Sequence, residues 1–300
     1  MDMDGLKIKG AVLKGANMRG ADLRKTRFTK CDLTGADLTA CAFGENTFEE
    51  SILDNIILAE NVISDARILG CSMNKANLAK VTMNRTVFEH TDLTGSMLEK
   101  ARLIECVFYK SQVQHCKMAN SLFEKGVINE SNFIGSDLTD SIINGDIVED
   151  SSFGECTLVR TNFSGSFFKG RLWSQPDFGE ANAKDVNFRK CQLIFVTMMD
   201  ANLENADFSD SSFENFDIQG ANLKNAKFIN SFFDGVNFST SDLTHADLTG
   251  AMFRDYLILD GTKLQGTIFK YVKLYENIEL DLQNTIYEGK SLPIEPRFKF

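Results

Sequence analysis

The 300-residue chain has few prolines and one tryptophan, and it lacks long apolar runs. Two of its three prolines, Pro293 and Pro296, lie close to the C-terminus. No run of about 18 apolar residues is present, so the sequence predicts no membrane-spanning helix. The N-terminal segment MDMDGLKIKG lacks the apolar stretch of a secretory signal. We therefore expect a soluble cytoplasmic protein with no membrane partner, while delivery by a specialised secretion system stays open.

The sequence also lacks the residue clusters of a metal or catalytic site. Its seven cysteines form no CxxC pair, and its three histidines are far apart in the repeat pattern described below. Gly15 and Gly20 are spaced like part of a phosphate-binding loop, but the required lysine is missing. We therefore predict a non-enzymatic protein with no catalytic residue, metal or cofactor. A formal net charge of −10 also gives no reason to expect direct nucleic-acid binding.

What the sequence does contain is a period of five residues. A large apolar residue recurs at every fifth position from Ile8 to Ile258, and Ala183 is the one exception. The residue two positions before each of these centres is mostly small, and all seven cysteines occupy that position. A period of five fits neither a helix nor a strand. The pattern predicts buried, reduced cysteines, and its phase shifts by one residue between Ile258 and Leu264.

The motif A(D/N)LXX, present as GADLR, GADLT, KANLA, DANLE, GANLK and HADLT, resembles the pentapeptide-repeat family. The resemblance covers about residues 6–275 and implies an all-β fold, a right-handed quadrilateral parallel β-helix (solenoid) with four pentapeptides in each square coil. The centre and the small residue point inward, and the other three residues point outward. We expect about 13 coils over residues 1–275 and a short C-terminal cap or tail over residues 276–300.

Every twentieth residue should stack in one column between coils. One interior column is rich in phenylalanine: Phe28, Phe48, Phe88, Phe108, Phe168, Phe188, Phe208 and Phe228. On the outside of the same coil side, five consecutive coils present Val87, Val107, Val127, Ile147 and Phe167, which we call the apolar stripe. Contiguous apolar patches often mark contact surfaces, so the stripe predicts binding of a protein partner or of a second copy in a homodimer. Stabilisation of a solvent-exposed parallel sheet by β-branched residues is the alternative.

A second candidate surface is acidic and contains Asp137, Asp140, Asp177 and Glu180 on one expected coil side. Some members of the family resemble duplex DNA in shape and charge, bind type II topoisomerases and confer resistance to quinolones or to other topoisomerase poisons. The resemblance therefore implies a type II topoisomerase (gyrase) as one partner to test. The acidic residues are unevenly distributed, since residues 61–130 are slightly basic.

The segment RLWSQPDFGEANA interrupts the pattern. Arg171 and Pro176 occupy small inward positions, Trp173 occupies a centre, and Ala183 occupies a large one. Because Arg171 cannot be buried without a partner, we expect a distorted coil with Arg171 in solvent. Asp146, Phe216 and Tyr256 also occupy small positions and predict further local distortion.

Three functions remain open from the sequence. The first is a protein-interaction rod or scaffold, the second is a topoisomerase-binding DNA mimic, and the third is a secreted bacterial effector. A repeat pattern defines a fold much better than it defines a function.

Overall fold

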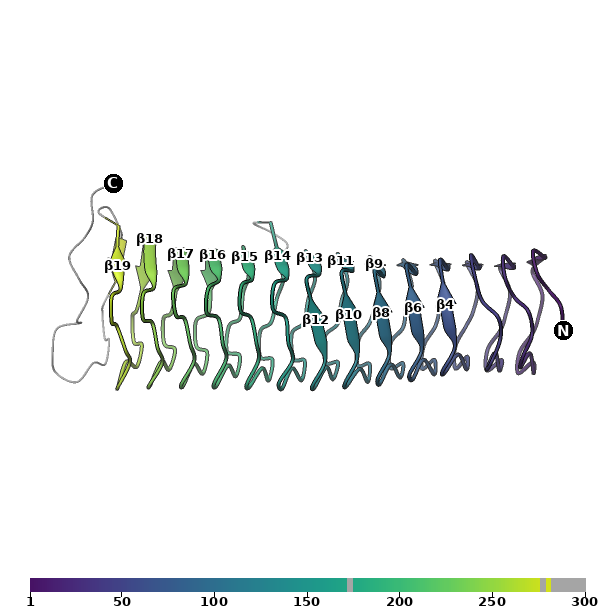
Figure 1. Ribbon diagram of the computed structural model, residues 1–300, viewed down its shortest axis with the longest axis horizontal. Helices are drawn as coiled ribbons and strands as arrows, with labels where there is room; N and C mark the ends of the chain where they lie inside the picture. The colour runs from purple at the N-terminus through teal and green to yellow at the C-terminus, as the bar shows by residue number, and fades with distance from the viewer. Residues whose placement is uncertain (172–174, 276–278, 282–300) are drawn as a thin grey trace. The chain divides into compact units, whose positions relative to one another are not determined.

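The computed structural model describes residues 1–171, 175–275 and 279–281 of the chain (Figure 1). Over these residues the chain is an all-β parallel solenoid of about 13 turns, with no helix in the described part. The residues group into two compact units, Met1–Ile147 and Val148–Phe300. Within the described ranges, no helix has the length and apolar character needed to cross a bilayer.

The first unit contains short strands of three residues that form two parallel sheets. The strands of one sheet, in order, are β1 (Lys7–Lys9), β2 (Arg27–Thr29), β3 (Thr47–Glu49), β5 (Arg67–Leu69), β7 (Val87–Glu89), β9 (Val107–Tyr109), β11 (Val127–Asn129) and β13 (Ile147–Glu149), of which Ile147 is the last residue of the unit. Those of the other are β12 (Ile142–Asn144), β10 (Leu122–Glu124), β8 (Arg102–Ile104), β6 (Thr82–Asn84) and β4 (Val62–Ser64). Paired residues are twenty positions apart, as in Val87 with Val107.

Most pentapeptides turn at their last residue, which adopts a left-handed backbone conformation. Gly15 has a φ of +65°, but bulky residues such as Lys100 (59°) do the same. The aspartate of the DLT motif supports the turn, because the Asp137 carboxylate accepts hydrogen bonds from the Thr139 backbone N–H (3.0 Å) and hydroxyl (2.7 Å). The same arrangement recurs at Asp32 and Thr34, Asp37 and Thr39, Asp92 and Thr94, Asp242 and Thr244, and Asp247 and Thr249. These acidic side chains therefore have a structural use in the repeat.

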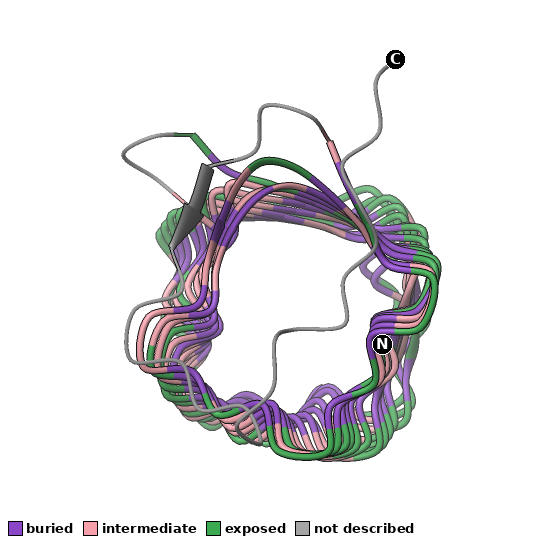
Figure 2. Ribbon diagram, turned by 90° about the vertical axis from the view of Figure 1, so that its left-hand side faces the viewer, coloured by how far each residue is buried: buried purple, intermediate pink, exposed green. Residues whose placement is uncertain are grey.

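The core lies inside the turns, where buried and exposed residues alternate along each side (Figure 2). All seven cysteines are buried and free, and burial raises the pKa of the Cys106 and Cys191 thiols to about 12. Small inward serines tie successive turns together, as when the Ser131 hydroxyl accepts a hydrogen bond from the Ser111 backbone N–H at 3.1 Å. The inward small position is thus a place for thiols and hydroxyls that bond to the backbone.

Asp146 occupies one of these small positions in the first unit and is 1% exposed. Its carboxylate accepts a hydrogen bond from the backbone N–H of Gly126. Gly126 leaves room for it, since a Cβ there would lie 2.7 Å from the Cys106 carbonyl oxygen and 3.0 Å from the carboxylate. Burial raises the pKa of Asp146 to about 6. The distortion that we expected at Asp146 is therefore limited to its side chain. The twenty-residue spacing between turns is kept.

The second unit contains longer strands. Its sheet has the order β14 (Phe167–Lys169), β15 (Gln192–Ile194), β16 (Ser212–Asp217), β17 (Phe232–Asn237), β18 (Met252–Ile258) and β19 (Lys273–Leu274), and β20 (Glu279–Asp281) also pairs with β18. β20 is the described part of the expected cap. The remainder of that cap, residues 276–278 and 282–300, lies outside the described residues.

One turn of the second unit is five residues longer than a regular turn of twenty residues. Ser152 pairs with Asp177, and Phe167 pairs with Gln192, so each pair is twenty-five positions apart. The additional residues fall between Gly170 and Pro176 in the sequence, and both of these residues are buried. The two ends of the insertion lie close together, because a Cβ on Gly170 would approach the Pro176 ring to 2.8 Å.

This insertion corrects the expected phenylalanine column. Phe188 does not continue the column of Phe168 but stacks on Phe163, with ring centroids 4.9 Å apart and planes 5° apart. Phe168 pairs instead with Leu193, and that column continues through Phe213, Phe233 and Phe253. The expectation that Phe188, Phe208 and Phe228 share the column of Phe168 is therefore wrong. In the second unit, a count of twenty residues per turn therefore assigns the residues after the insertion to the wrong coil side. They lie one side away from the position that this count predicts.

A second irregularity adds one residue at Asp255 and Tyr256, earlier than expected. Val236 pairs with Leu257, twenty-one positions on. As a result Leu257 and Leu259 are buried, and Ile258 is not an inward centre. Tyr256 is half-buried and does not fill the small position; its ring lies 2.5 Å from the place of a Cβ on Gly235. Phe216 does occupy the small position, is fully buried and packs on Phe213 at 4.7 Å between ring centroids.

Candidate interaction surfaces

The apolar stripe divides between the two units. In the first unit, Val87 pairs with Val107 and Val107 with Val127 on β7, β9 and β11, and β13 places Ile147 next in order. The three valines are half-buried, and Ile147 is 42% exposed. Phe167 belongs to β14 of the second unit, where it is half-buried and pairs with Gln192. Four of the five predicted residues thus form a continuous outward column in the first unit.

Tyr109 lies beside this column and was not singled out from the sequence. It is half-buried on β9, two residues after Val107. The His90 ring meets it edge-on at 5.9 Å, and the Lys110 ammonium lies 5.0 Å from its ring centroid. Tyrosine is enriched at protein interfaces because it combines a large apolar area with a polar group. Its position in the repeat, two residues after a stripe residue, could have identified it.

The second sheet of the first unit also carries outward apolar residues that sequence reasoning missed. Leu122 on β10 pairs with Ile142 on β12, which is 41% exposed. Val62 on β4 is 61% exposed. The corner at Lys125 and Gly126 separates Leu122 from Val127, so apolar residues lie on two successive sides of the same turn.

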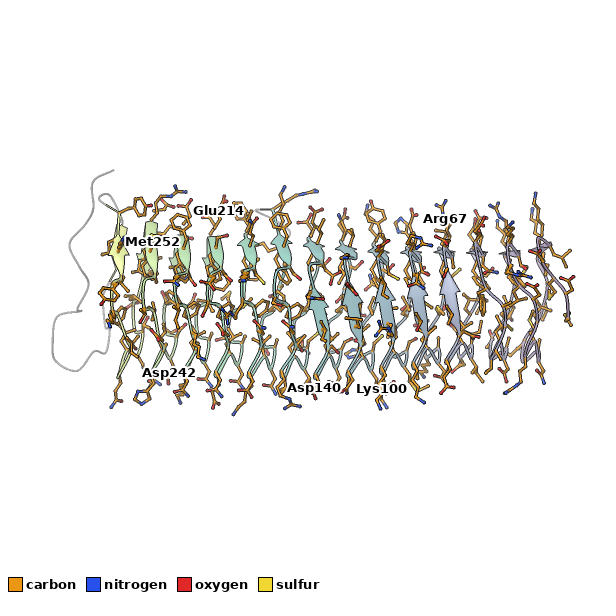
Figure 3. All side chains as sticks on the ribbon, in the orientation of Figure 1. Arg67, Lys100, Asp140, Glu214, Asp242 and Met252 are labelled. Carbon is orange, nitrogen blue, oxygen red and sulfur yellow. The ribbon has the colours of Figure 1, made fainter. Side chains whose placement is uncertain are left out.

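The four predicted acidic residues lie in different units. Asp137 and Asp140 belong to the first unit, and Asp177 and Glu180 belong to the second. Asp177 pairs with Ser152, so the twenty-residue spacing that grouped it with Asp137 does not hold at the long turn. Its carboxylate accepts a hydrogen bond from the Gly179 backbone N–H at 2.8 Å. Asp140 and Glu180 are exposed at corners with left-handed backbone conformations (Figure 3 labels Asp140).

The interrupted segment coincides with the five-residue insertion. The Arg171 side chain is 75% exposed, and its Nε lies 3.2 Å from the Asp150 carboxylate, which is 4% exposed. Pro176 and Ala183 are both buried in inward positions. Trp173 lies outside the described residues.

The histidines His90, His115 and His245 occupy separate corners. Among residues 1–171, 175–275 and 279–281, no group of three histidine, cysteine or acidic residues could hold a metal ion.

The chain was compared with protein families and with solved structures. A family model described as pentapeptide repeats matches in eight copies over residues 4–43, 71–108, 177–215 and 221–255. HetL from the cyanobacterium Nostoc sp. strain PCC 7120, a pentapeptide repeat protein involved in heterocyst differentiation regulation, is 20% identical over 97% of this chain and 91% of that one, with a TM-score of 0.23. QnrB1, a plasmid-mediated fluoroquinolone resistance protein, is 15% identical over 92% and 90%, with a TM-score of 0.25. No curated protein matches the sequence.

Proposed function

The chain belongs to the pentapeptide-repeat family, and from this premise we propose that it is a non-enzymatic scaffold that binds a protein partner through the apolar stripe of its first unit. The observation that carries the proposal is the unbroken outward column of Val87, Val107, Val127 and Ile147 on adjacent parallel strands. A column of this kind presents apolar area that water solvates poorly, and burial of that area favours association.

The surroundings of the stripe support a protein as the occupant. Tyr109 adds an aromatic contact beside Val107, and the nearby Lys110 and Glu130 form an ion pair at 3.5 Å. An apolar centre with a polar border is the usual anatomy of a protein–protein interface. The stripe is narrow, so we expect a transient complex rather than an obligate one.

The test compares charge substitutions inside and outside the stripe. Val107→Lys and Ile147→Lys should each weaken partner retention from a lysate of the source cells at least tenfold, because an ammonium group cannot be buried without a counter-charge. Ile52→Lys is the matched control, since Ile52 is 44% exposed but stands between Asp32 and Ser72 in its column. Sedimentation velocity on the same variants detects a homodimer. If both stripe variants retain the same partner and the same self-association as the wild type, the proposal is wrong.

A second candidate is binding to a type II topoisomerase as a DNA mimic. The acidic excess of the second unit favours it, since residues 148–300 contain 22 acidic and 15 basic residues. Purified protein would then inhibit gyrase supercoiling or reduce fluoroquinolone-induced cleavage. Absence of both effects at micromolar protein would remove this candidate and leave the first untouched.

A further inference from the structure

A shallow hollow of about 170 Å³ lies on the outer face of the second unit, across β15, β16, β17 and β18. Its position follows from the sizes of the outward residues. Ser212 is small and stands in one column between Gln192 and Phe232, so it leaves a gap in a row of larger side chains. Ile194 and Phe213 contribute apolar atoms to the lining. The five-residue insertion creates this column, because it pairs Gln192 with Phe167.

Three polar groups at the hollow are unused within the described part of the chain. Glu214, Ser212 and Gln192 line the hollow, and the side chain of none of them has a hydrogen-bond or ion-pair partner among the described residues. Glu214 is exposed, and Figure 3 marks it on the second unit. One acidic residue, two further polar residues and apolar residues therefore line the same hollow.

The other charges of the hollow already neutralise each other. The Arg254 guanidinium donates two hydrogen bonds to the Asp234 carboxylate, one of them 2.8 Å long from Nε. Arg254 also lies over the Phe232 ring, 5.3 Å from its centroid. This pairing lowers the pKa of Asp234 and raises that of Arg254, so both stay charged and paired. Glu214 alone is left to attract a ligand of opposite charge.

We propose that this hollow binds one lysine or arginine side chain from an extended segment of a protein partner. The aliphatic stem of such a side chain packs on Ile194 and Phe232, and its cationic end pairs with Glu214. The remaining donors of the ammonium or guanidinium reach the oxygens of Ser212 and Gln192. The acidic excess of the second unit favours encounter with a basic segment. This site is separate from the apolar stripe, and either could exist without the other.

The test uses the full chain and a peptide of defined composition. The probe is acetyl-Gly-Val-Arg-Val-Gly-amide, and the matched control peptide has norleucine in place of arginine. Nuclear magnetic resonance titration should show shifts at Ile194, Ser212 and Phe232 with the arginine peptide. The norleucine peptide should bind at least fivefold more weakly, because it lacks the charge that pairs with Glu214.

Three variants separate the hollow from general attraction. Glu214→Gln should weaken binding of the arginine peptide at least fivefold, whereas Glu155→Gln removes the same charge from an exposed corner elsewhere in the second unit and should change it less than twofold. Ser212→Leu fills the hollow without altering charge and should also weaken binding at least fivefold. Far-UV circular dichroism and the thermal midpoint confirm that each variant is folded.

Several results would overturn the proposal. Equal binding of the norleucine peptide, or an equal loss with Glu155→Gln and Glu214→Gln, would mean that no specific cation site exists. Binding of 1,4-diaminobutane as tightly as the peptide would identify a free amine as the ligand instead of a protein segment. No shift at millimolar peptide would exclude the site. None of these results bears on the stripe variants Val107→Lys and Ile147→Lys.

Discussion

The first unit keeps a twenty-residue spacing between its paired strands from β1 to β11, whereas the second unit departs from that spacing twice. The departures add five residues after Gly170 and one residue at Asp255. Both units nevertheless keep the same inward and outward alternation. The two units therefore show that two properties of the repeat are separable. The five-residue phase decides which side chains are buried, and the number of pentapeptides in a turn decides which side chains meet between turns.

The separation has consequences for function. In the first unit, regular spacing aligns Val87, Val107 and Val127 into an outward column. In the second unit, the insertion brings Gln192 beside Phe167 and so assembles a different outward column with Ser212 and Phe232. Charge also differs, with 20 acidic and 17 basic residues in the first unit against 22 and 15 in the second. The regular unit therefore offers an apolar surface, and the irregular unit offers an acidic hollow.

The largest effect should come from a direct test of register at the long turn. Thr157 pairs with Asn182, twenty-five positions on, whereas a regular turn would pair it with Asp177. Paired residues of parallel strands lie about 4.8 Å apart, within the Cα separation that a disulfide spans. The double variant Thr157→Cys and Asn182→Cys should cross-link almost completely under mild oxidation, measured as a loss of two hydrogen atoms from the intact mass.

The control for this test is Thr157→Cys with Asp177→Cys, which should stay reduced because Asp177 pairs with Ser152. The wild-type protein controls for the seven native cysteines, which are buried. A cross-link in the control pair and none in the test pair would show that the second unit has a regular twenty-residue turn here.

Part of this comparison could be predicted from the sequence, and the reasons are physical. A side chain faces inward or outward according to its place in the pentapeptide, so the buried cysteines and phenylalanines could be identified without a structure. The insertion could not be placed, because twenty-five is also a multiple of five and leaves the phase unchanged. Arg171 and Pro176, in positions that need small apolar residues, indicated a distortion but not its length. The one-residue shift was placed too late because Leu257, Ile258 and Leu259 are all apolar and fit either phase.

The same reasoning explains the outcome for the surfaces. The column from Val87 to Ile147 lies within the regular unit, where counting by twenty is sufficient. The hollow at Ser212 depends on the shifted column and could not be found by counting. Among the described residues the Glu214 side chain has no hydrogen-bond or ion-pair partner, and this depends on side-chain geometry that a repeat pattern does not contain.

A smaller effect should come from Asp146, the buried acidic residue that occupies a small inward position in the first unit. Its raised pKa means that the folded protein holds a proton more tightly than the unfolded chain does. The free energy of unfolding therefore falls as the pH rises from about 4 to about 6. Above about pH 6 the Asp146 carboxylate is ionised in both states, and its destabilising effect no longer changes with pH. Asp146→Ser should raise the free energy of unfolding at pH 7 by about 2 kcal/mol and flatten this pH dependence. Urea unfolding at pH 4 and pH 7 measures both quantities.

Serine is the informative replacement because Ser131 and Ser141 accept the equivalent backbone hydrogen bond from the preceding turn. Glu105→Gln, which removes an exposed acid from the same unit, controls for the change in net charge. A serine variant that is less stable than the wild type at pH 7, with an unchanged pH profile, would show that the buried carboxylate stabilises the fold.

The smallest effect should come from glycine-to-alanine substitutions at two corners, a regular one and the one next to the one-residue shift. Gly15 and Gly235 both have positive φ, but a Cβ on Gly15 meets no atom within 4 Å, whereas on Gly235 it would lie 2.5 Å from the Tyr256 ring. Gly15→Ala should therefore cost about 1 kcal/mol, which is the price of the backbone conformation alone. Gly235→Ala should cost about 1 kcal/mol more, because the ring must move. In the background of Tyr256→Ala, the two substitutions should become equal in urea unfolding. A difference that persists without the ring would mean that the backbone at Asp255, rather than the side chain of Tyr256, carries the strain of the additional residue.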